Sequence, residues 1–303
     1  MRQELWGSER FTKAGRGENH AGTCRMHPAR TIWRTCKPME WDAQDLKDLA
    51  TAVNLLENPG LVAKISDLVG TPIEYLVKRL PSGTADKISR TVHGSLLTAV
   101  NTAVKTMNPN DRRRPHARRH TAAAGLAGGV GGAFGLLALP IELPVTTTII
   151  MRSIADIARS EGEDLSSLPS RLACLEVFAM GGASDADDAA ESGYFAVRAA
   201  LAQAVSEAAK YLARRTVVED GAPVIVRLLA QIAARFNTVV GEKIMAQGVP
   251  VVGALGGATV NVLFIEHFQD MARGHFTVRR LERTYGEDEV RRAYEELLGT
   301  RDE

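Results

Sequence analysis

The sequence predicts an all-α fold, a multi-helix bundle, and three observations lead to this class. From Trp41 onward, apolar residues recur every three or four positions, which is the period of an amphipathic helix. Runs in which apolar and polar residues alternate, as they do in half-buried strands, are scarce. Two uncharged stretches, residues 121–141 and 244–265, are rich in glycine and alanine. Residues this small allow helix backbones to approach one another closely.

The first half of the chain is read from its apolar spacing and its end signals. Asp42 is expected to cap a first helix, which ends near the Asn-Pro-Gly sequence of residues 58–60. The apolar face of this helix holds Leu46, Leu49, Val53 and Leu56. Two short helical segments follow, residues 61–70 and 71–80. Residues 82–104 form a longer helix, with Ile88, Val92, Leu96, Val100 and Val104 on one face.

The second half repeats the helical pattern. Four further helices are predicted over residues 146–159, 170–180, 194–215 and 287–298. Glycines follow the first two and indicate where each ends. Pro223 begins a helix of more than twenty residues, and the second Gly/Ala-rich stretch continues into the helix after it.

The two Gly/Ala-rich stretches show the small-xxx-small spacing of a glycine zipper. The residues expected to pack helices closely are Gly125, Gly128, Gly129, Gly132, Gly253 and Gly257. A helical glycine costs about 1 kcal/mol relative to alanine, so tight packing must offset this cost. We expect two Gly/Ala-rich helical hairpins, packed centrally or against a membrane. Both stretches have the length of a bilayer span, about 20 residues, but Pro140, Pro250 and Asn261 weaken them as spans. Spans, inserting hairpins and ordinary core helices all stay open.

The charge of the chain is uneven, although its net charge is only +1. Residues 1–38 hold eight of the Lys and Arg residues and three of the Asp and Glu residues, so the rest is acidic. We interpret residues 1–38 as a disordered leader and Met39 as the true start of the protein. Residues 39–303 are expected to form one helical domain, with a basic loop at residues 107–120 as an internal boundary. Three cysteines cannot all pair, which suits a reducing cytoplasm.

The basic loop offers a contact for an anionic membrane. Its arginines are Arg112, Arg113, Arg114, Arg118 and Arg119. Each basic residue near an anionic lipid surface contributes about 1 kcal/mol. A solvated loop with excess charge is the alternative. Nucleic acid is not expected as a partner, because no aromatic residues alternate with the arginines.

Several polar residues interrupt apolar helices and are candidates for chemistry. They are Glu142, Arg152, Asp156, Glu176, His267 and Asp270. Carboxylates and histidines on facing helices form one site in some helical bundles. The alternative is that these residues only form buried ion pairs, as buried charges normally do. The sequence contains no HExxH, GxSxG or phosphate-loop motif, and no cofactor or metal is predicted.

Four segments resemble the bacterial EcsC family: ALPIELPVTTTIIMRSIADIARSEGEDL, ACLEVFAMGG, DDAAESGYFAVRAALA and GALGGATVNVLFIEHFQDMARGHFTVRRLERTYG. They occur in the same order as in the family, and the resemblance covers roughly residues 39–286. The family's namesake is encoded beside the subunits of an ABC transport system. The resemblance therefore implies an accessory protein in the cytoplasm or at the membrane, and it provides no catalytic residues to carry over.

Two hypotheses for function follow. The first is a non-enzymatic accessory protein, peripheral or hairpin-inserted at the inner membrane, whose partner is an anionic membrane surface or a membrane transport or secretion complex. Self-association into a homo-oligomer is compatible with it. The second is a hydrolase or a metal- or ligand-binding protein that uses the buried Glu/Asp/His/Arg cluster, with a carboxylate or His267 as general base.

Overall fold

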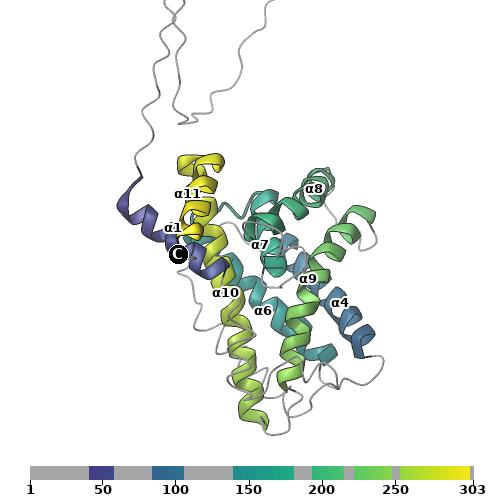
Figure 1. Cartoon of the computed structure of the whole chain (residues 1–303). Helices are drawn as coiled ribbons and strands as arrows, with labels where there is room; N and C mark the ends of the chain where they lie inside the picture. The colour runs from purple at the N-terminus through teal and green to yellow at the C-terminus, as the bar shows by residue number, and fades with distance from the viewer. Residues whose placement is uncertain are drawn as a thin grey trace, which may run out of the picture. The chain divides into compact units, whose positions relative to one another are not determined.

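The computed structural model describes residues 41–57, 84–105, 139–180, 193–214, 222–247 and 253–300. Within these ranges the fold is all-α, with no strands and with eight helices packed into a bundle (Figure 1). The helices are α1 (Ala43–Leu56), α4 (Thr84–Lys105), α6 (Leu139–Ser160), α7 (Leu168–Met180), α8 (Gly193–Ala213), α9 (Pro223–Gln247), α10 (Gly253–Tyr285) and α11 (Glu287–Gly299). The predicted segments 61–70 and 71–80 lie outside the described residues.

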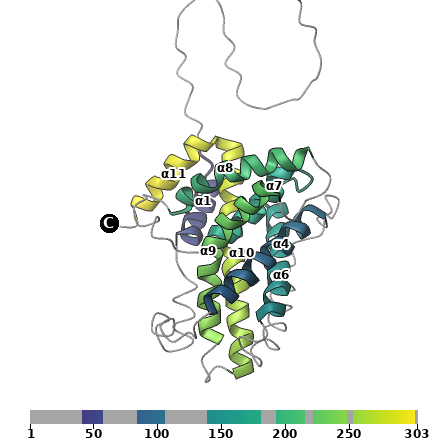
Figure 2. The same ribbon diagram turned by 90° about the vertical axis from the view of Figure 1, so that its right-hand side faces the viewer.

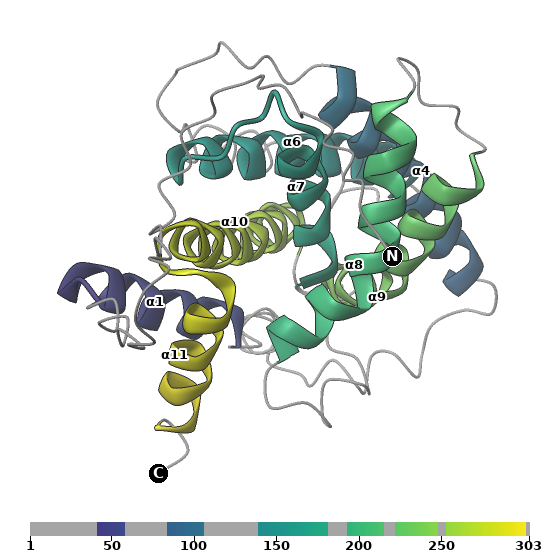
Figure 3. The same cartoon turned by 90° about the horizontal axis from the view of Figure 1, so that it is seen from above.

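The helix α10 lies at the centre of the arrangement. It is the longest of the described helices, with 33 residues, and it packs against α1, α6, α7, α9 and α11 (Figure 3). On the other side of the bundle, α4 packs against α6 and α9, and α8 packs against α7 and α9. The helices α6, α9 and α10 extend to the same end of the bundle, the lower end in Figures 1 and 2.

The structure confirms the predicted cap of the first helix and most of its predicted apolar face. The Asp42 side chain caps α1 by accepting a hydrogen bond from the backbone N–H of Gln44, at 2.7 Å. The buried face contains Leu49, Ala52, Val53 and Leu56. Leu46, which was predicted to share this face, is 39% exposed. Leu46 therefore lies outside the buried face of α1.

The helix α6 begins at Leu139, earlier than the predicted start at Thr146. The predicted helix began only after the two prolines of LPIELPV. Pro140 lies in the first turn, where a helix has no use for the missing backbone N–H. Pro144 lies inside the helix, and the hydroxyl of Thr148 donates to its carbonyl at 2.8 Å.

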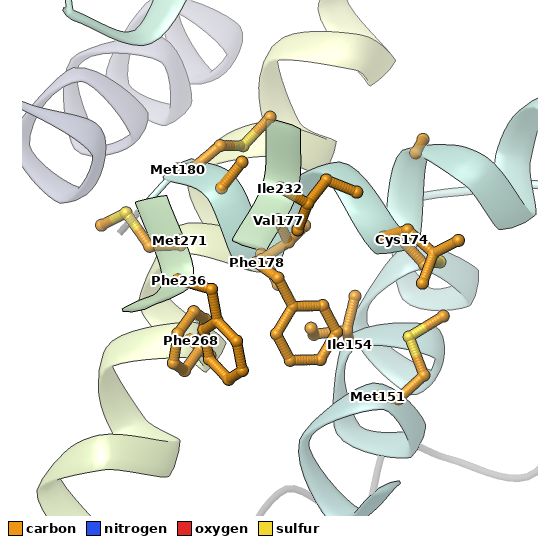
Figure 4. Close-up of a cluster of buried hydrophobic side chains, with 14 of the residues drawn as sticks. Met151, Ile154, Cys174, Val177, Phe178, Met180, Ile232, Phe236, Phe268 and Met271 are labelled. Carbon is orange, nitrogen blue, oxygen red and sulfur yellow. The ribbon is translucent and has the colours of Figure 1, made fainter. Parts of the chain in front are cut away.

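The core of the bundle is built from aromatic rings on three helices. Phe178 of α7 meets Phe236 of α9 edge to face, with 5.2 Å between ring centroids. Phe236 meets Phe268 of α10 at 5.6 Å, also edge to face. Figure 4 shows these rings together, with Met151 and Ile154 of α6 beside them. This geometry adds favourable ring contacts to the burial of apolar area.

A glycine allows α1 to approach α10 closely. A Cβ atom added at Gly274 would lie 2.6 Å from Cγ of Leu56. We therefore expect Gly274→Ala to lower the free energy of unfolding by about 1–3 kcal/mol, the usual cost of overpacking. Gly94 of α4 has nothing within 4 Å of its added Cβ, so Gly94→Ala should stabilise the protein by about 1 kcal/mol. Urea unfolding of the two variants measures both effects, and equal signs would contradict the close approach.

Candidate functional site

The six predicted catalytic candidates lie on three helices. The residues are Glu142, Arg152 and Asp156 on α6, Glu176 on α7, and His267 and Asp270 on α10. Among the described contacts, no hydrogen bond or ion pair joins any two of them. About 21 Å of helix axis separates Glu142 from Asp156, at 1.5 Å per residue. One small ligand could therefore contact only one of these two carboxylates.

Three of the candidates have ion-pair partners that the sequence reading did not name. Glu142 pairs with Lys243, Asp156 pairs with Arg159 at 2.7 Å, and Asp270 pairs with Arg273 at 2.6 Å. The last two pairs follow from helix geometry, because residues three positions apart lie side by side on the helix surface.

The other three candidates differ in their surroundings. Arg152 is exposed to solvent. His267 is buried, and its ring lies against Phe268 with 5.2 Å between centroids. Burial raises the pKa of Glu176, although the positive charges of Arg279 and Arg198 act in the opposite direction.

The predicted membrane and packing residues fall mostly on parts of the chain that are not described. Those outside the described residues are Arg112, Arg113, Arg114, Arg118, Arg119, Gly125, Gly128, Gly129 and Gly132. Gly253 and Gly257 lie in the first turns of α10, so the second Gly/Ala-rich stretch is helical from Gly253 onward. The same stretch also contains the end of α9.

A buried ion pair joins the beginning of α6 to the end of α9. The Lys243 ammonium donates to Oε1 of Glu142 at 2.6 Å, and the two side chains are 0% and 4% exposed. The same ammonium lies 4.7 Å from the ring centroid of Phe264 on α10. Burial lowers the pKa of Lys243, and the charge of Glu142 opposes this shift. We call Glu142, Thr146, Lys243 and Phe264 the Glu142 junction.

Polarity is inverted along the first turns of α6. Glu142, Thr146 and Thr147 are buried. Ile141 and Val145 are 76% and 47% exposed, although they are large and apolar. This part of α6 thus buries a carboxylate and two hydroxyls together with Leu143, while two of its aliphatic side chains are exposed. A water-soluble amphipathic helix has the opposite arrangement.

A second polar cluster lies nearer the other end of the bundle. We call it the His275 junction, and its members are Glu176 of α7, Tyr194 and Arg198 of α8, and His275, Arg279 and Glu282 of α10. Arg198 makes two hydrogen bonds to the Glu282 carboxylate, at 2.5 and 3.1 Å. Arg198 also donates to the Tyr194 hydroxyl oxygen at 3.3 Å. These contacts tie α8 to α10.

His275 is the most unusual member of this cluster. It is 0% exposed, and its Nδ1 lies 3.0 Å from the Tyr194 hydroxyl. Since the tyrosine oxygen already accepts from Arg198, we assign the hydroxyl proton to the bond with Nδ1. The neutral ring then carries its own proton on Nε2, which is buried and has no hydrogen-bond partner. Burial, together with the positive charges of Arg198 and Arg279, lowers the pKa of His275 well below its usual value.

A carboxylate beside this junction is fully paired. Glu163 accepts from Arg279 at 2.8 Å, from Arg283 at 2.5 Å and from the Ser170 hydroxyl at 2.5 Å. Burial alone would raise the pKa of Glu163, but the hydrogen bonds from Arg279 and Ser170 hold it below its usual value. Glu163 therefore joins the turn after α6 to α10.

Sequence reasoning missed the residues that form most of the two junctions. It named Glu142 and Glu176 but not Lys243, Tyr194 or His275. Two signals were present. Lys243 is the charge that immediately precedes the second uncharged stretch, and His275, Arg279 and Glu282 recur at the spacing of one helix face. No group of three or more His, Cys, Asp or Glu side chains within the described ranges is arranged to hold a metal ion.

These helices and junctions define an all-α bundle protein with buried polar contacts between its helices. The sequence matches the EcsC protein family over residues 61–281. The match covers well over half of the chain, so this protein belongs to the EcsC family. Searches of curated proteins and of solved structures found no match.

Proposed function

We propose that this EcsC-family protein is a non-enzymatic accessory protein that docks on the inner face of a membrane. The docking end would be the end of the bundle that contains the Glu142 junction. The observation that carries the proposal is the inverted polarity of α6, with Ile141 and Val145 exposed and Glu142 buried. Charged residues at membrane depth usually face the interior of a bundle and pair there.

The positions of the two Gly/Ala-rich stretches in the sequence support the same end of the bundle as the docking end. The first stretch leads directly into α6, and the second contains the end of α9 and the beginning of α10. The Glu142–Lys243 bond brings these helix ends together. The predicted electrostatic contact by Arg112–Arg119 would lie just before the first stretch. The partner is an anionic lipid surface or a membrane transport complex of the ABC type.

Docking at the surface fits better than a stable membrane span. Of the helices in the described ranges, α9 alone has the length and composition to cross a membrane, over Pro223–Ile244. Core helices of soluble proteins pass the same test. Phe236 and Ile232 of α9 are 0% exposed and form part of the aromatic core. We therefore place α9 in the bundle, with only its end near the lipid.

A hydrolase has less support than a binding protein. A general base must come within hydrogen-bond reach of its substrate. His275 is 0% exposed and already contacts Tyr194, and burial raises the pKa of the Cys174 thiol and so disfavours the reactive thiolate. The carboxylates Asp156 and Asp270 are each paired with an arginine on the same helix.

The double variant Ile141→Asp/Val145→Asp tests the proposed docking end. Vesicle flotation with anionic lipid should show binding at least about tenfold weaker than that of the wild type, because two exposed aliphatic contacts of roughly 1 kcal/mol or more each are lost. Both side chains are exposed, so the fold should tolerate the change. Circular dichroism checks that the helices remain.

Val226→Asp is the matched control. Val226 is 38% exposed and lies in the first turn of α9, far from the Glu142 junction on the same helix. Its vesicle binding should equal that of the wild type. Equal loss in both variants, or wild-type protein that stays unbound with anionic vesicles and with isolated membranes, would refute the proposed docking end.

A further inference from the structure

Two buried oxygen atoms in the Glu142 junction have no hydrogen-bond partner. Oε1 of Glu142 accepts from Lys243, but Oε2 of the same carboxylate is buried and unpartnered. The hydroxyl of Thr146, one turn later on the same face of α6, is also unpartnered. Glu142 is 6% exposed and Thr146 is 0% exposed.

The two threonines that follow Thr146 both use their hydroxyls in hydrogen bonds, so the unpartnered hydroxyl is particular to Thr146. The Thr147 hydroxyl donates to the carbonyl of Leu143 at 2.7 Å, and the Thr148 hydroxyl donates to the carbonyl of Pro144 at 2.8 Å. Three consecutive threonines on one helix thus include only one whose hydroxyl is not used within the helix. Buried polar groups of native proteins are nearly always hydrogen-bonded, so this pair calls for a hydrogen-bond partner that the described residues do not supply.

The chemistry of the two oxygens restricts that occupant. A carboxylate oxygen only accepts, so the occupant must donate N–H or O–H groups, and an ammonium makes the strongest such bonds. A second cation beside the Lys243 ammonium would be repelled by it, since both would share one carboxylate. An ammonium that carries an anionic group of its own avoids this repulsion, because the anionic group can contact Lys243. A zwitterion with a primary ammonium and a phosphate meets both requirements.

We propose that the Glu142 junction binds the head group of a phosphatidylethanolamine-type lipid, with its ammonium on Glu142 and Thr146 and its phosphate on Lys243. A lipid is favoured over a free zwitterion because the exposed Ile141 and Val145 flank Glu142 and offer a surface for acyl chains. This inference rests on the proposed membrane docking and specifies its lipid. A choline head group carries no N–H donor, so the site should discriminate against it.

The test compares vesicles whose lipid head groups do or do not carry N–H donors. One set contains phosphatidylethanolamine and the other contains phosphatidylcholine, each with the same fraction of phosphatidylglycerol. Wild-type protein should bind the phosphatidylethanolamine vesicles about tenfold more tightly, which corresponds to one charge-assisted hydrogen bond. Thr146→Val should reduce this preference severalfold, and Glu142→Gln should abolish it.

Thr147→Val is the control, because Thr147 is equally buried but its hydroxyl bonds to its own helix. It should keep the full preference, and any difference in lipid packing between the vesicles acts on it as on the wild type. Thr146→Val also keeps the ion pair, so the test does not depend on the stability of Glu142→Gln.

The results separate this inference from the proposed function. Equal binding to both vesicle types, or an unchanged preference in Thr146→Val, overturns the head-group site and leaves membrane docking in place. Failure to bind either vesicle type removes the docking proposal, and the head-group site with it.

Discussion

Replacing Lys243 by methionine is expected to lower the free energy of unfolding by about 3–5 kcal/mol, the cost of leaving a buried charge without its partner. The Glu142 carboxylate would lose its ion-pair partner in a place where it is only 6% exposed. The loss of the 2.6 Å bond would also separate the beginning of α6 from the end of α9. Urea or guanidinium unfolding, followed by circular dichroism, measures the change.

The double variant Glu142→Leu/Lys243→Met should recover most of this loss. Apolar residues of similar volume often replace a buried ion pair without cost, because neither charge then has to leave water. The matched control is Arg273→Met, which breaks a partly exposed pair with Asp270 and should cost no more than about 1 kcal/mol. If Lys243→Met costs no more than Arg273→Met, the pair is not buried in solution.

The sequence predicted the helices well wherever the signals are local. Asp42 caps α1 as expected, and α7, α9 and α11 begin or end near the predicted residues. Apolar spacing and cap residues act within one or two turns, so a single sequence contains them. The early start of α6 was not predicted, because the predicted helix began only after Pro144; Pro140 fits the first turn, which tolerates proline, and Pro144 lies inside the helix.

The candidate site was less predictable, because its contacts join distant parts of the chain. Glu142 and Lys243 are 101 residues apart, and Tyr194 and His275 are 81 residues apart. Helical periodicity gives the face on which a residue lies but not the helix that it meets. Nothing in the local sequence could therefore test whether the candidate residues share one site. The inverted polarity of α6 can be recognised only from the exposure of Ile141, which depends on how the bundle packs.

Lowering the pH from 7 towards 5 is expected to destabilise the protein through His275. Its folded-state pKa lies well below the unfolded value of about 6.5. Below pH 6.5 the unfolded chain therefore binds the proton more readily than the folded protein. The free energy of unfolding falls with pH across this window, by up to about 1.4 kcal/mol per pH unit. A protonated ring would lie near the positive charges of Arg198 and Arg279 and would lose Nδ1 as an acceptor for Tyr194.

His275→Gln isolates this contribution, because glutamine cannot take up the proton but can still accept from Tyr194. Glu176 acts in the opposite direction: its pKa is raised by burial, so the folded protein binds a proton more readily above about pH 4.5 and stability falls as the pH rises there. The slope of unfolding free energy between pH 5 and 6.5 should therefore be smaller, or reversed, in His275→Gln. Denaturant titrations at four or five pH values measure both slopes. Identical slopes in the two proteins would mean that His275 takes up its proton in the folded state as easily as in the unfolded chain, and that the His275 junction is open to water.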